Sequence, residues 1–94
     1  MKIGIVGSGK FGRVLAQIAG DNGHDVLIFS RRDAEVNSIN TEKKSTSGFE
    51  FHSKSNITAT TNPGDLSSVT YVLFSISSRD FRKVMDSIKP YIKN

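Results

Sequence analysis

Residues 7–12 read Gly-Ser-Gly-Lys-Phe-Gly, a spacing of glycines that can hold a phosphate group. The spacing is informative because an apolar stretch precedes it and an amphipathic stretch follows it within about 30 residues, the context of a dinucleotide-binding turn. In such a turn Gly7 permits a tight bend, Gly9 lets the backbone approach a pyrophosphate, and Gly12 lets a helix pack closely on a sheet. The unpaired N–H groups and the dipole at the helix start favour an anion there. The turn expected to bind the cofactor therefore comprises Gly7, Ser8, Gly9 and Gly12. The alternative is a glycine-rich turn that binds nothing, although glycine destabilises a helix and needs a reason at each position.

The second group of interest follows the apolar stretch 26–29. A dinucleotide without a 2′-phosphate is usually held at this point by an acid, whereas an arginine accommodates the phosphorylated form. Ser30, Arg31 and Arg32 include no acid, and a guanidinium binds phosphate through two parallel hydrogen bonds. We therefore expect these three residues to bind the cofactor, with NADP(H) preferred. Asp33 keeps NAD(H) open as the alternative if the strand runs further, and the arginines could also belong to a solvated loop.

The first of the elements that must position these residues is a helix after the glycine turn. Its apolar positions follow helical spacing and predict a single buried stripe, whose members are Phe11, Val14, Leu15, Ile18 and Ala19. Between them, Arg13, Gln17 and Asp21 are expected to face outward. Gly23 suits the left-handed position after the last turn of this helix.

The rest of the chain continues the alternation of strands and helices. We expect a helix over about 33–40, a polar loop or lid over 41–56 with Phe49 and Phe51 as apolar anchors, and a strand over 57–61. A turn or helix start at 62–65 leads to a strand over 69–76 that is apolar on both faces, as in a covered parallel sheet. Ser77 and Asp80 are spaced as a helix cap. A helix over about 79–89 follows, with one apolar face and Pro90 at its end.

This order predicts an α/β fold with a doubly wound, mostly parallel, Rossmann-like sheet that has about four strands in this chain. Right-handed crossovers give the strand order 3-2-1-4. The carboxyl ends of the strands then meet at one edge, where Ser75 and Ile76 should line the same crevice as the glycine turn. Residues 1–94 are expected to form a single dinucleotide-binding domain.

Composition narrows the choice of partners. The chain has 94 residues, 36% of them hydrophobic, and no cysteine, so we expect one modest core and no thiolate chemistry. The apolar runs fall short of the roughly 18–20 residues of a membrane span, and the N-terminus has no signal-peptide pattern. His24 and His52 lack metal-ligand spacing. A net charge of +4 from 13 basic and 9 acidic residues is too mild to indicate nucleic acid, and no aromatic residues are interleaved with the basic ones. The expectation is a cytoplasmic protein.

Several segments together resemble the N-terminal domain of bacterial NAD(P)-dependent sn-glycerol-3-phosphate dehydrogenases. They are the glycine turn and the stretches Asn-Gly-His-Asp-Val (22–26), Ser-Arg-Arg-Asp (30–33), Ile-Asn-Thr-Glu (39–42) and Asn-Ile-Thr-Ala-Thr-Thr (56–61). The resemblance implies an oxidoreductase family that reduces dihydroxyacetone phosphate to glycerol 3-phosphate for phospholipid synthesis. It places cofactor contacts on Lys10, Phe11, Arg31 and Arg32. The family usually has serine where this chain has Lys10.

The resemblance also implies what lies outside this chain. The family's catalytic lysine follows the next strand, and its substrate-phosphate contacts lie in a helical second domain. We therefore expect residues 1–94 to hold no catalytic residue and to bind the cofactor without turnover. Two alternatives remain: a stand-alone nucleotide-binding or sensor module, and the N-terminal half of another NADP-dependent reductase acting on imines or β-hydroxy acids.

The predicted topology also has consequences for the oligomeric state. The fourth strand would lie at the edge of the sheet, and an apolar edge strand is a template for another chain. We expect either a homodimer through this edge or a last helix that folds over it.

Overall fold

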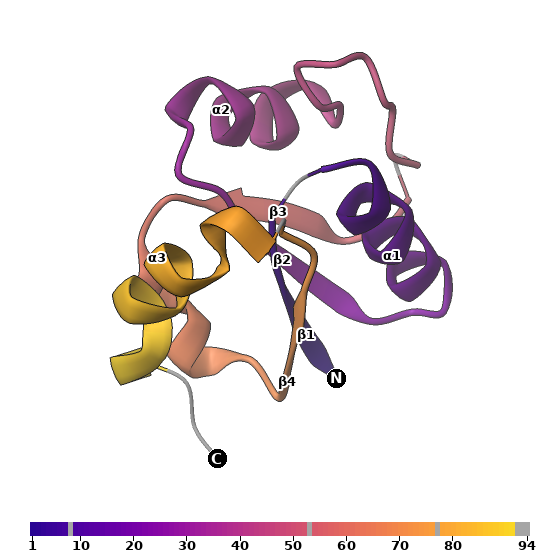
Figure 1. Cartoon of the computed structure of the whole chain (residues 1–94). Coiled ribbons are helices and arrows are strands. Elements are labelled where there is room, and N and C mark those ends of the chain that lie inside the picture. The colour runs from indigo at the N-terminus through magenta and orange to yellow at the C-terminus, as the bar shows by residue number, and fades with distance from the viewer. Residues whose placement is uncertain (8, 53, 77, 92–94) are drawn as a thin grey trace.

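A computed structural model describes residues 1–7, 9–52, 54–76 and 78–91 of the chain (Figure 1). Strands and helices alternate along these residues. In chain order they are β1 (Lys2–Val6), α1 (Lys10–Asp21), β2 (Asp25–Phe29), α2 (Asp33–Glu42), β3 (Ile57–Thr60), the 3-10 helix η1 (Pro63–Ser68), β4 (Tyr71–Phe74), α3 (Ser78–Ile88) and the short 3-10 helix η2 (Lys89–Tyr91).

The four strands form one parallel sheet in the order β3-β2-β1-β4, which confirms the predicted fold and strand order. Ile5 at the centre of the sheet is in register with Ile28 of β2 on one side and with Leu73 of β4 on the other. Because all strands run the same way, their carboxyl ends meet at one edge. The chain leaves β1 for α1, β2 for α2 and β4 for α3 at this edge.

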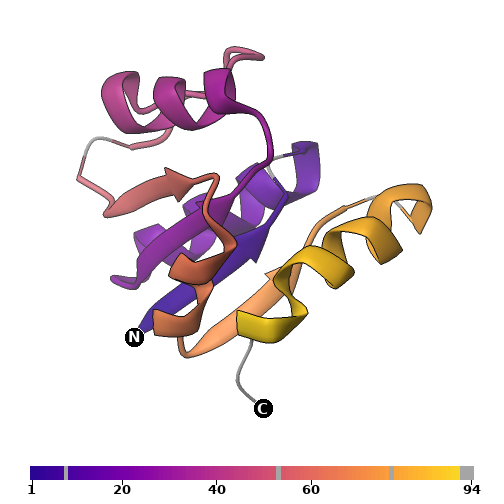
Figure 2. The ribbon, with the colours of Figure 1, turned by 90° about the vertical axis from the view of Figure 1, so that its left-hand side faces the viewer.

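Two apolar cores lie on opposite faces of the sheet. The first contains residues of α1, α2 and the loop before β3, and its buried members are Ile5, Ala16, Val26, Ile28, Ile39, Phe51, Ile57 and Ala59. The second contains residues of η1 and α3, and its buried members are Val6, Leu27, Phe29, Leu66, Val84 and Ile88. Figure 2 shows α3 on the side of the sheet away from α1 and α2. This two-sided cover is that of a doubly wound fold.

The buried face of α1 differs from the prediction. Phe11 and Ile18 are 67% and 54% exposed, and Val14 is exposed as well. The residues of this helix that face the sheet are small, and the fully buried ones are Gly12, Ala16 and Gly20, spaced four apart. Leu15 and Ala19 of the predicted stripe do pack against the first core. A helix that approaches a sheet closely needs small residues at the contact, so hydrophobicity alone identified only part of the buried face. The prediction that Gly23 occupies a left-handed position is confirmed by its φ of 85°.

The polar stretch after α2 is folded back on itself. Lys44 and Glu50 form an antiparallel bridge, and the turn between them uses Gly48, whose φ is 99°. We call residues 44–50 the 44–50 loop. Phe49 and Phe51 anchor it as predicted, with their rings in edge-to-face contact at 5.2 Å and Phe51 buried in the first core. The loop is therefore packed against the first core through these two rings.

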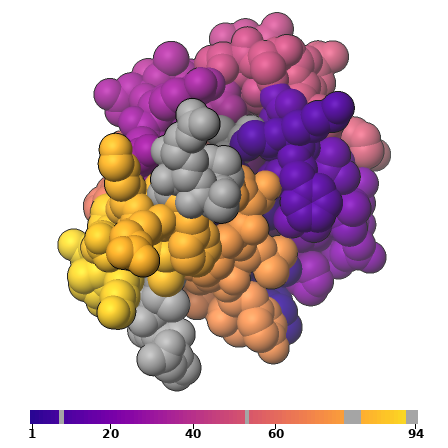
Figure 3. Space-filling model, viewed as in Figure 1, coloured from indigo at the N-terminus to yellow at the C-terminus, as the bar shows by residue number. Residues whose placement is uncertain are grey.

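The strand β4 is less covered than predicted. Tyr71 is 58% exposed, and Leu73 and Phe74 are exposed too, so the expectation of an apolar strand buried on both faces is wrong for the described residues. Within the described part of the chain, β4 pairs with β1 alone. The last helix does not fold over the free edge, because Val84 and Ile88 pack against the face of the sheet. Figure 3 shows the orange surface of β4 uncovered on this side of the molecule.

Two smaller observations complete the fold. The predicted cap residue Ser77 lies outside the described residues, and α3 ends at Ile88, just before Pro90. Over the described ranges, no helix has the length and apolar character needed to cross a membrane.

Candidate functional site

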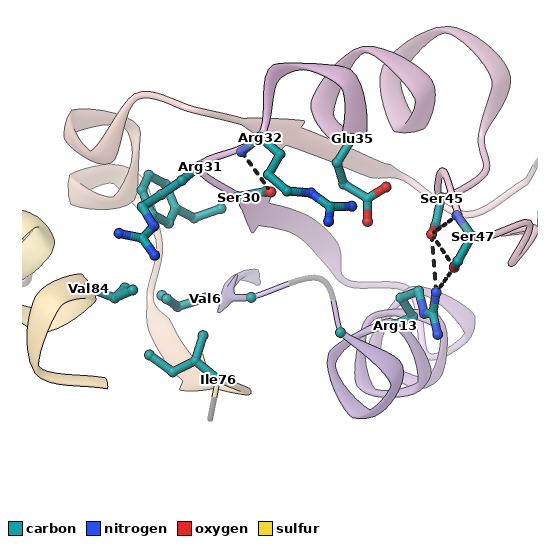
Figure 4. A pocket seen from close by; sticks show the side chains of 13 residues that line it. Val6, Arg13, Ser30, Arg31, Arg32, Glu35, Ser45, Ser47, Ile76 and Val84 are labelled. Carbon is teal, nitrogen blue, oxygen red and sulfur yellow. Dashed lines mark hydrogen bonds between the residues drawn. The ribbon is translucent and has the colours of Figure 1, made fainter. Parts of the chain in front are cut away.

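A cleft of about 320 Å³ opens at the carboxyl edge of the sheet. Its walls come from the turn between β1 and α1, the end of β2, the starts of α1 and α2, and the 44–50 loop (Figure 4). Ligands of open α/β sheets bind at this edge, outside the carboxyl ends of the strands. Six residues predicted to bind the cofactor line the cleft: Gly7, Gly9, Ser30, Arg31, Arg32 and Ile76.

Gly7 and Gly12 are required by packing inside the protein. Gly7 has a φ of 107°, and a Cβ atom there would lie 2.3 Å from the carbonyl oxygen of Ser75. A Cβ atom on Gly12 would lie 2.5 Å from the carbonyl oxygen of Gly7. These two glycines therefore let the end of β1, the end of β4 and the start of α1 meet at one point.

No packing contact within the protein requires a glycine at position 9. Its φ of −66° and ψ of −178° are open to any residue, and a Cβ atom built on it meets nothing within 4 Å. It stands at the N-cap of α1, where no side chain caps the helix, and the first N–H groups of a helix have no partner within it. A side chain at this position would fill that space. The arrangement therefore fits a pyrophosphate held by the helix N-terminus.

The end of β2 brings two arginines to the cleft. Ser30 is buried, and its Oγ accepts a hydrogen bond of 3.2 Å from the backbone N–H of Arg32, which shapes the turn. Arg31 and Arg32 then extend in different directions, Arg31 towards the side of Val84 and Arg32 towards α2 (Figure 4). A nitrogen of the Arg32 guanidinium donates a 3.1 Å hydrogen bond to Thr46 Oγ1.

The structure does not bring all predicted site residues together. Ser75 lies beneath the glycine turn, where its N–H donates to the carbonyl oxygen of Val6 at 2.8 Å. Lys10 and Phe11 are exposed and do not line the cleft, Gly12 is buried under the turn, and Ser8 lies outside the described residues. Asp33, on which the alternative of NAD(H) binding depended, is exposed at the start of α2 and does not line the cleft either.

Sequence reasoning missed four polar residues that line the cleft: Arg13, Glu35, Ser45 and Ser47. Arg13 was predicted to face outward, but it donates hydrogen bonds to the hydroxyls of Ser45, at 3.2 Å, and Ser47, and it lies over the Phe49 ring at 5.5 Å. The sequence spacing could have placed Arg13 at the cleft, because Arg13 stands four residues after Gly9 and so shares its side of the helix.

Glu35 is the carboxylate of the cleft. It is 2% exposed, and its Oε1 accepts hydrogen bonds from the backbone N–H of Thr46 at 2.7 Å and from Thr46 Oγ1 at 2.9 Å. Its position four residues before Ile39 already placed it on the inward face of α2. Arg13, Arg31, Arg32 and Glu35 together give the lining an excess of positive charge, which suits a phosphate-bearing ligand.

A second hollow, of about 510 Å³, lies at the other end of α1 and includes Asp21 and His52. His52 Nδ1 is 2.9 Å from Asp21 Oδ1, and both side chains are well exposed. Desolvation, the largest single influence, acts to raise the pKa of Asp21, but the hydrogen bonds from His52, Gln17 and Ser55 and the charge of His52 bring that pKa below its ordinary value. This pair ties α1 to the segment before β3 and is remote from the cleft.

The glycine turn and the arginine-lined cleft, placed at the carboxyl edge of this sheet, define a Rossmann-like nucleotide-binding domain. Comparison with known proteins narrows this class to a family. Residues 2–94 match the family model described as NAD-dependent glycerol-3-phosphate dehydrogenase N-terminus. The chain therefore belongs to that family.

Individual relatives agree with the family match. The chain is 35% identical over 85 residues to glycerol-3-phosphate dehydrogenase (NAD(P)+) of Limosilactobacillus reuteri (strain DSM 20016), a match that covers 88% of this chain and 25% of that protein. It is 32% identical over 93 residues to the protein of the same name from Bacillus thuringiensis (strain Al Hakam), covering 97% of this chain and 27% of that one. The chain thus spans about a quarter of the length of the curated relatives it matches.

Solved structures show the same architecture. The crystal structure of glycerol-3-phosphate dehydrogenase from Coxiella burnetii matches with a TM-score of 0.85 and 25% identity, covering 99% of this chain and 29% of that one. A PanE/ApbA family ketopantoate reductase from Ralstonia eutropha JMP134 matches with a TM-score of 0.76 at 22% identity, covering 99% of this chain and 31% of that one, and shares the fold alone. The family match therefore favours glycerol-3-phosphate dehydrogenase over the other reductases considered.

Proposed function

We propose that this chain is the NADP(H)-binding domain of an enzyme that reduces dihydroxyacetone phosphate to sn-glycerol 3-phosphate. The observation that carries the proposal is the open space in front of Gly9, at an uncapped helix N-terminus and within an arginine-lined cleft. The family match supports the enzyme class. Because the chain spans about a quarter of its relatives, the reaction itself belongs to the whole protein.

The described residues account for binding and orientation of the cofactor. The N–H groups after Gly9 would hold the pyrophosphate, and the arginines after β2 would lie at its adenosine end. Ile76, at the end of β4, would line the opposite end of the cleft. When bound, the nicotinamide supplies the hydride, and the cleft's contribution is to hold it in place. We expect residues 1–94 to bind without turnover.

The preference for NADP(H) rests on charge. Three arginines line the cleft, and guanidinium groups bind a phosphate monoester more readily than a diol. The single carboxylate in the described lining, Glu35, accepts two hydrogen bonds from Thr46 and is thereby turned towards the loop. The balance of charge therefore favours the phosphorylated dinucleotide.

Calorimetric titration of the chain with NADPH and, separately, with NADH tests this function. We expect both dinucleotides to bind, with NADPH at least about tenfold tighter, equivalent to about 1.4 kcal/mol. Equal affinities would retain the dinucleotide-binding domain but contradict the preference. Binding of neither would contradict the proposed function and leave a module that uses the fold for another purpose.

We also propose that the free edge of β4 pairs with a second copy of this chain. The strand Tyr71–Phe74 carries no charge, and native edge strands are usually protected by charged residues or by cover. Leu73 is in register with Ile5 and points to the same face of the sheet, the face that α1 covers. The exposed apolar residues of α1 therefore extend this surface; they are Phe11, Val14 and Ile18.

Sedimentation equilibrium is expected to show a dimer of this chain. Leu73→Lys should make it monomeric, because a charge on an edge strand disfavours pairing. Thr58→Lys is the matched control on β3, the opposite edge strand, and should remain dimeric. A wild-type chain that sediments as a monomer would rule out the pairing.

A further inference from the structure

Two arginines from different parts of the chain reach the same short segment. Arg13 of α1 donates hydrogen bonds to Ser45 Oγ, at 3.2 Å, and to Ser47 Oγ. Arg32, after β2, donates to Thr46 Oγ1 at 3.1 Å. The hydroxyls of three consecutive residues therefore lie between two guanidinium groups. Arg13, Arg32, Ser45 and Ser47 all line the cleft, with Arg13 on the side of α1 and Arg32 extending into it from above (Figure 4).

Arg31 does not share this arrangement. Its guanidinium extends towards the side of Val84, away from the 44–50 loop (Figure 4). The two consecutive arginines after β2 therefore cannot act as a pair on one phosphate in this conformation. The second cation on the side of Arg32 comes from α1.

The hydrogen bonding of Arg13 is incomplete. Its Nε atom is buried and has no hydrogen-bond partner among the described residues. A buried donor without an acceptor is rare in folded proteins and calls for an explanation. A guanidinium has five donors in a planar fork that matches phosphate oxygens, and Arg13 lines the cleft, so its terminal nitrogens are the donors that an anion there would meet; the buried Nε is not one of them.

We propose that Arg13 and Arg32, together with the hydroxyls of Ser45 and Ser47, form the subsite for the 2′-phosphate of NADP(H). The inference rests on the proposed function, since it names the residues that would produce its cofactor preference. Arg13 is then a specificity-determining residue, and Arg31 is not. The dianion of a phosphate monoester is the ligand class that two converging guanidinium groups and two hydroxyls recognise.

Glu35 has a definite part in this subsite. Thr46 Oγ1 accepts from Arg32 and donates to Glu35 Oε1, so the carboxylate orients the hydroxyl that holds the Arg32 side chain. Glu35 also accepts from the Thr46 N–H, which fixes the turn of the loop. It is a positioning residue that acts through Thr46.

The test compares single variants of the full chain by calorimetric titration with NADPH and NADH. Arg13→Gln should weaken NADPH by about 10- to 100-fold, the range for charged hydrogen bonds, and change NADH by less than about threefold. Arg32→Gln should behave in the same way. Arg82→Gln is the matched control, with the same change of charge, because Arg82 is exposed on α3 and does not line the cleft; it should leave the NADPH-to-NADH ratio unaltered.

A second pair of measurements separates recognition from structure. Arg13→Lys keeps the charge and should restore part of the NADPH preference, which a merely structural role would not require. Adenosine 2′-monophosphate should compete with NADPH on the wild-type chain, and adenosine 5′-monophosphate should compete less well. Circular dichroism melting of each variant reports whether the domain still folds.

The possible failures are distinct. A wild-type chain that prefers NADPH, with an Arg13→Gln variant that keeps the preference, would overturn this subsite and leave the proposed function standing. Equal losses of NADPH and NADH in Arg13→Gln would also overturn it, because Arg13 would then support the cleft without recognising the phosphate. A wild-type chain that binds neither dinucleotide would overturn the proposed function, and this subsite with it.

Discussion

Replacing Gly7 with alanine is expected to lower the free energy of unfolding by about 2–6 kcal/mol, the sum of backbone strain and overpacking. The residue has a φ of 107°, where a side chain is strained, and its Cβ would lie 2.3 Å from Ser75 O and 2.8 Å from Ile76 Cγ2. The backbone cannot easily shift, because Gly7 N–H donates to Phe29 O at 2.9 Å and Ser75 N–H to Val6 O at 2.8 Å. Domains of this kind have a total stability of about 5–15 kcal/mol, so the variant would lose a large share of its stability.

Urea denaturation followed by circular dichroism measures this loss, and Gly23→Ala is its control. Gly23 also has a positive φ, 85°, but a Cβ atom there meets nothing within 4 Å. Gly23→Ala should therefore lower the free energy of unfolding only through backbone strain, by about 1–2 kcal/mol. If the free energy of unfolding falls equally in the two variants, the close contact between the glycine turn and the end of β4 adds nothing to the cost of a side chain at Gly7.

Gly9→Val is expected to leave the fold intact and to weaken dinucleotide binding by up to about 100-fold, as overpacking of about 1–3 kcal/mol would do. The backbone at Gly9 has a φ of −66°, which valine adopts without strain, and a Cβ atom there meets nothing within 4 Å. The valine side chain would fill the space in front of the helix N-terminus. The stability should fall by no more than about 1 kcal/mol, because valine is a poorer N-cap than glycine.

Titration with NADPH and NADH, combined with a melting curve, separates these two effects. Both dinucleotides should lose affinity equally, since the pyrophosphate is common to them. Gly9→Ala, with a smaller side chain, should give a smaller loss. Unchanged affinity in Gly9→Val would show that no phosphate lies in front of Gly9, whatever the chain binds.

Much of the fold could be predicted because the signals are local. The glycine turn between β1 and α1 implies a strand followed by a helix, and the handedness of parallel crossovers then restricts the strand order to the one observed. Gly23 marks the end of α1 because few residues adopt its left-handed conformation. The turn at the start of η1 and the end of α3 before Pro90 follow from the same kind of local preference.

The burial of particular faces could not be predicted in the same way. Helical periodicity shows which residues of α1 share a face, but the choice of face depends on how closely the helix approaches the sheet. Here that contact is made by Gly12, Ala16 and Gly20, so the larger Phe11 and Ile18 are exposed. The exposure of β4 could not be predicted for a similar reason. An apolar sequence such as Tyr71–Phe74 does not show whether its strand lies at the edge or at the centre of a sheet.

The sequence alone determined the class of this protein and the position of its glycine turn, because both depend on glycines and strand–helix alternation close together in the chain. Only the tertiary structure decided which charges share the cleft. Arg13 and Arg32 come from different elements and meet through the 44–50 loop, while the adjacent Arg31 points elsewhere. Side-chain direction depends on packing between segments distant in sequence, and no local pattern specifies it.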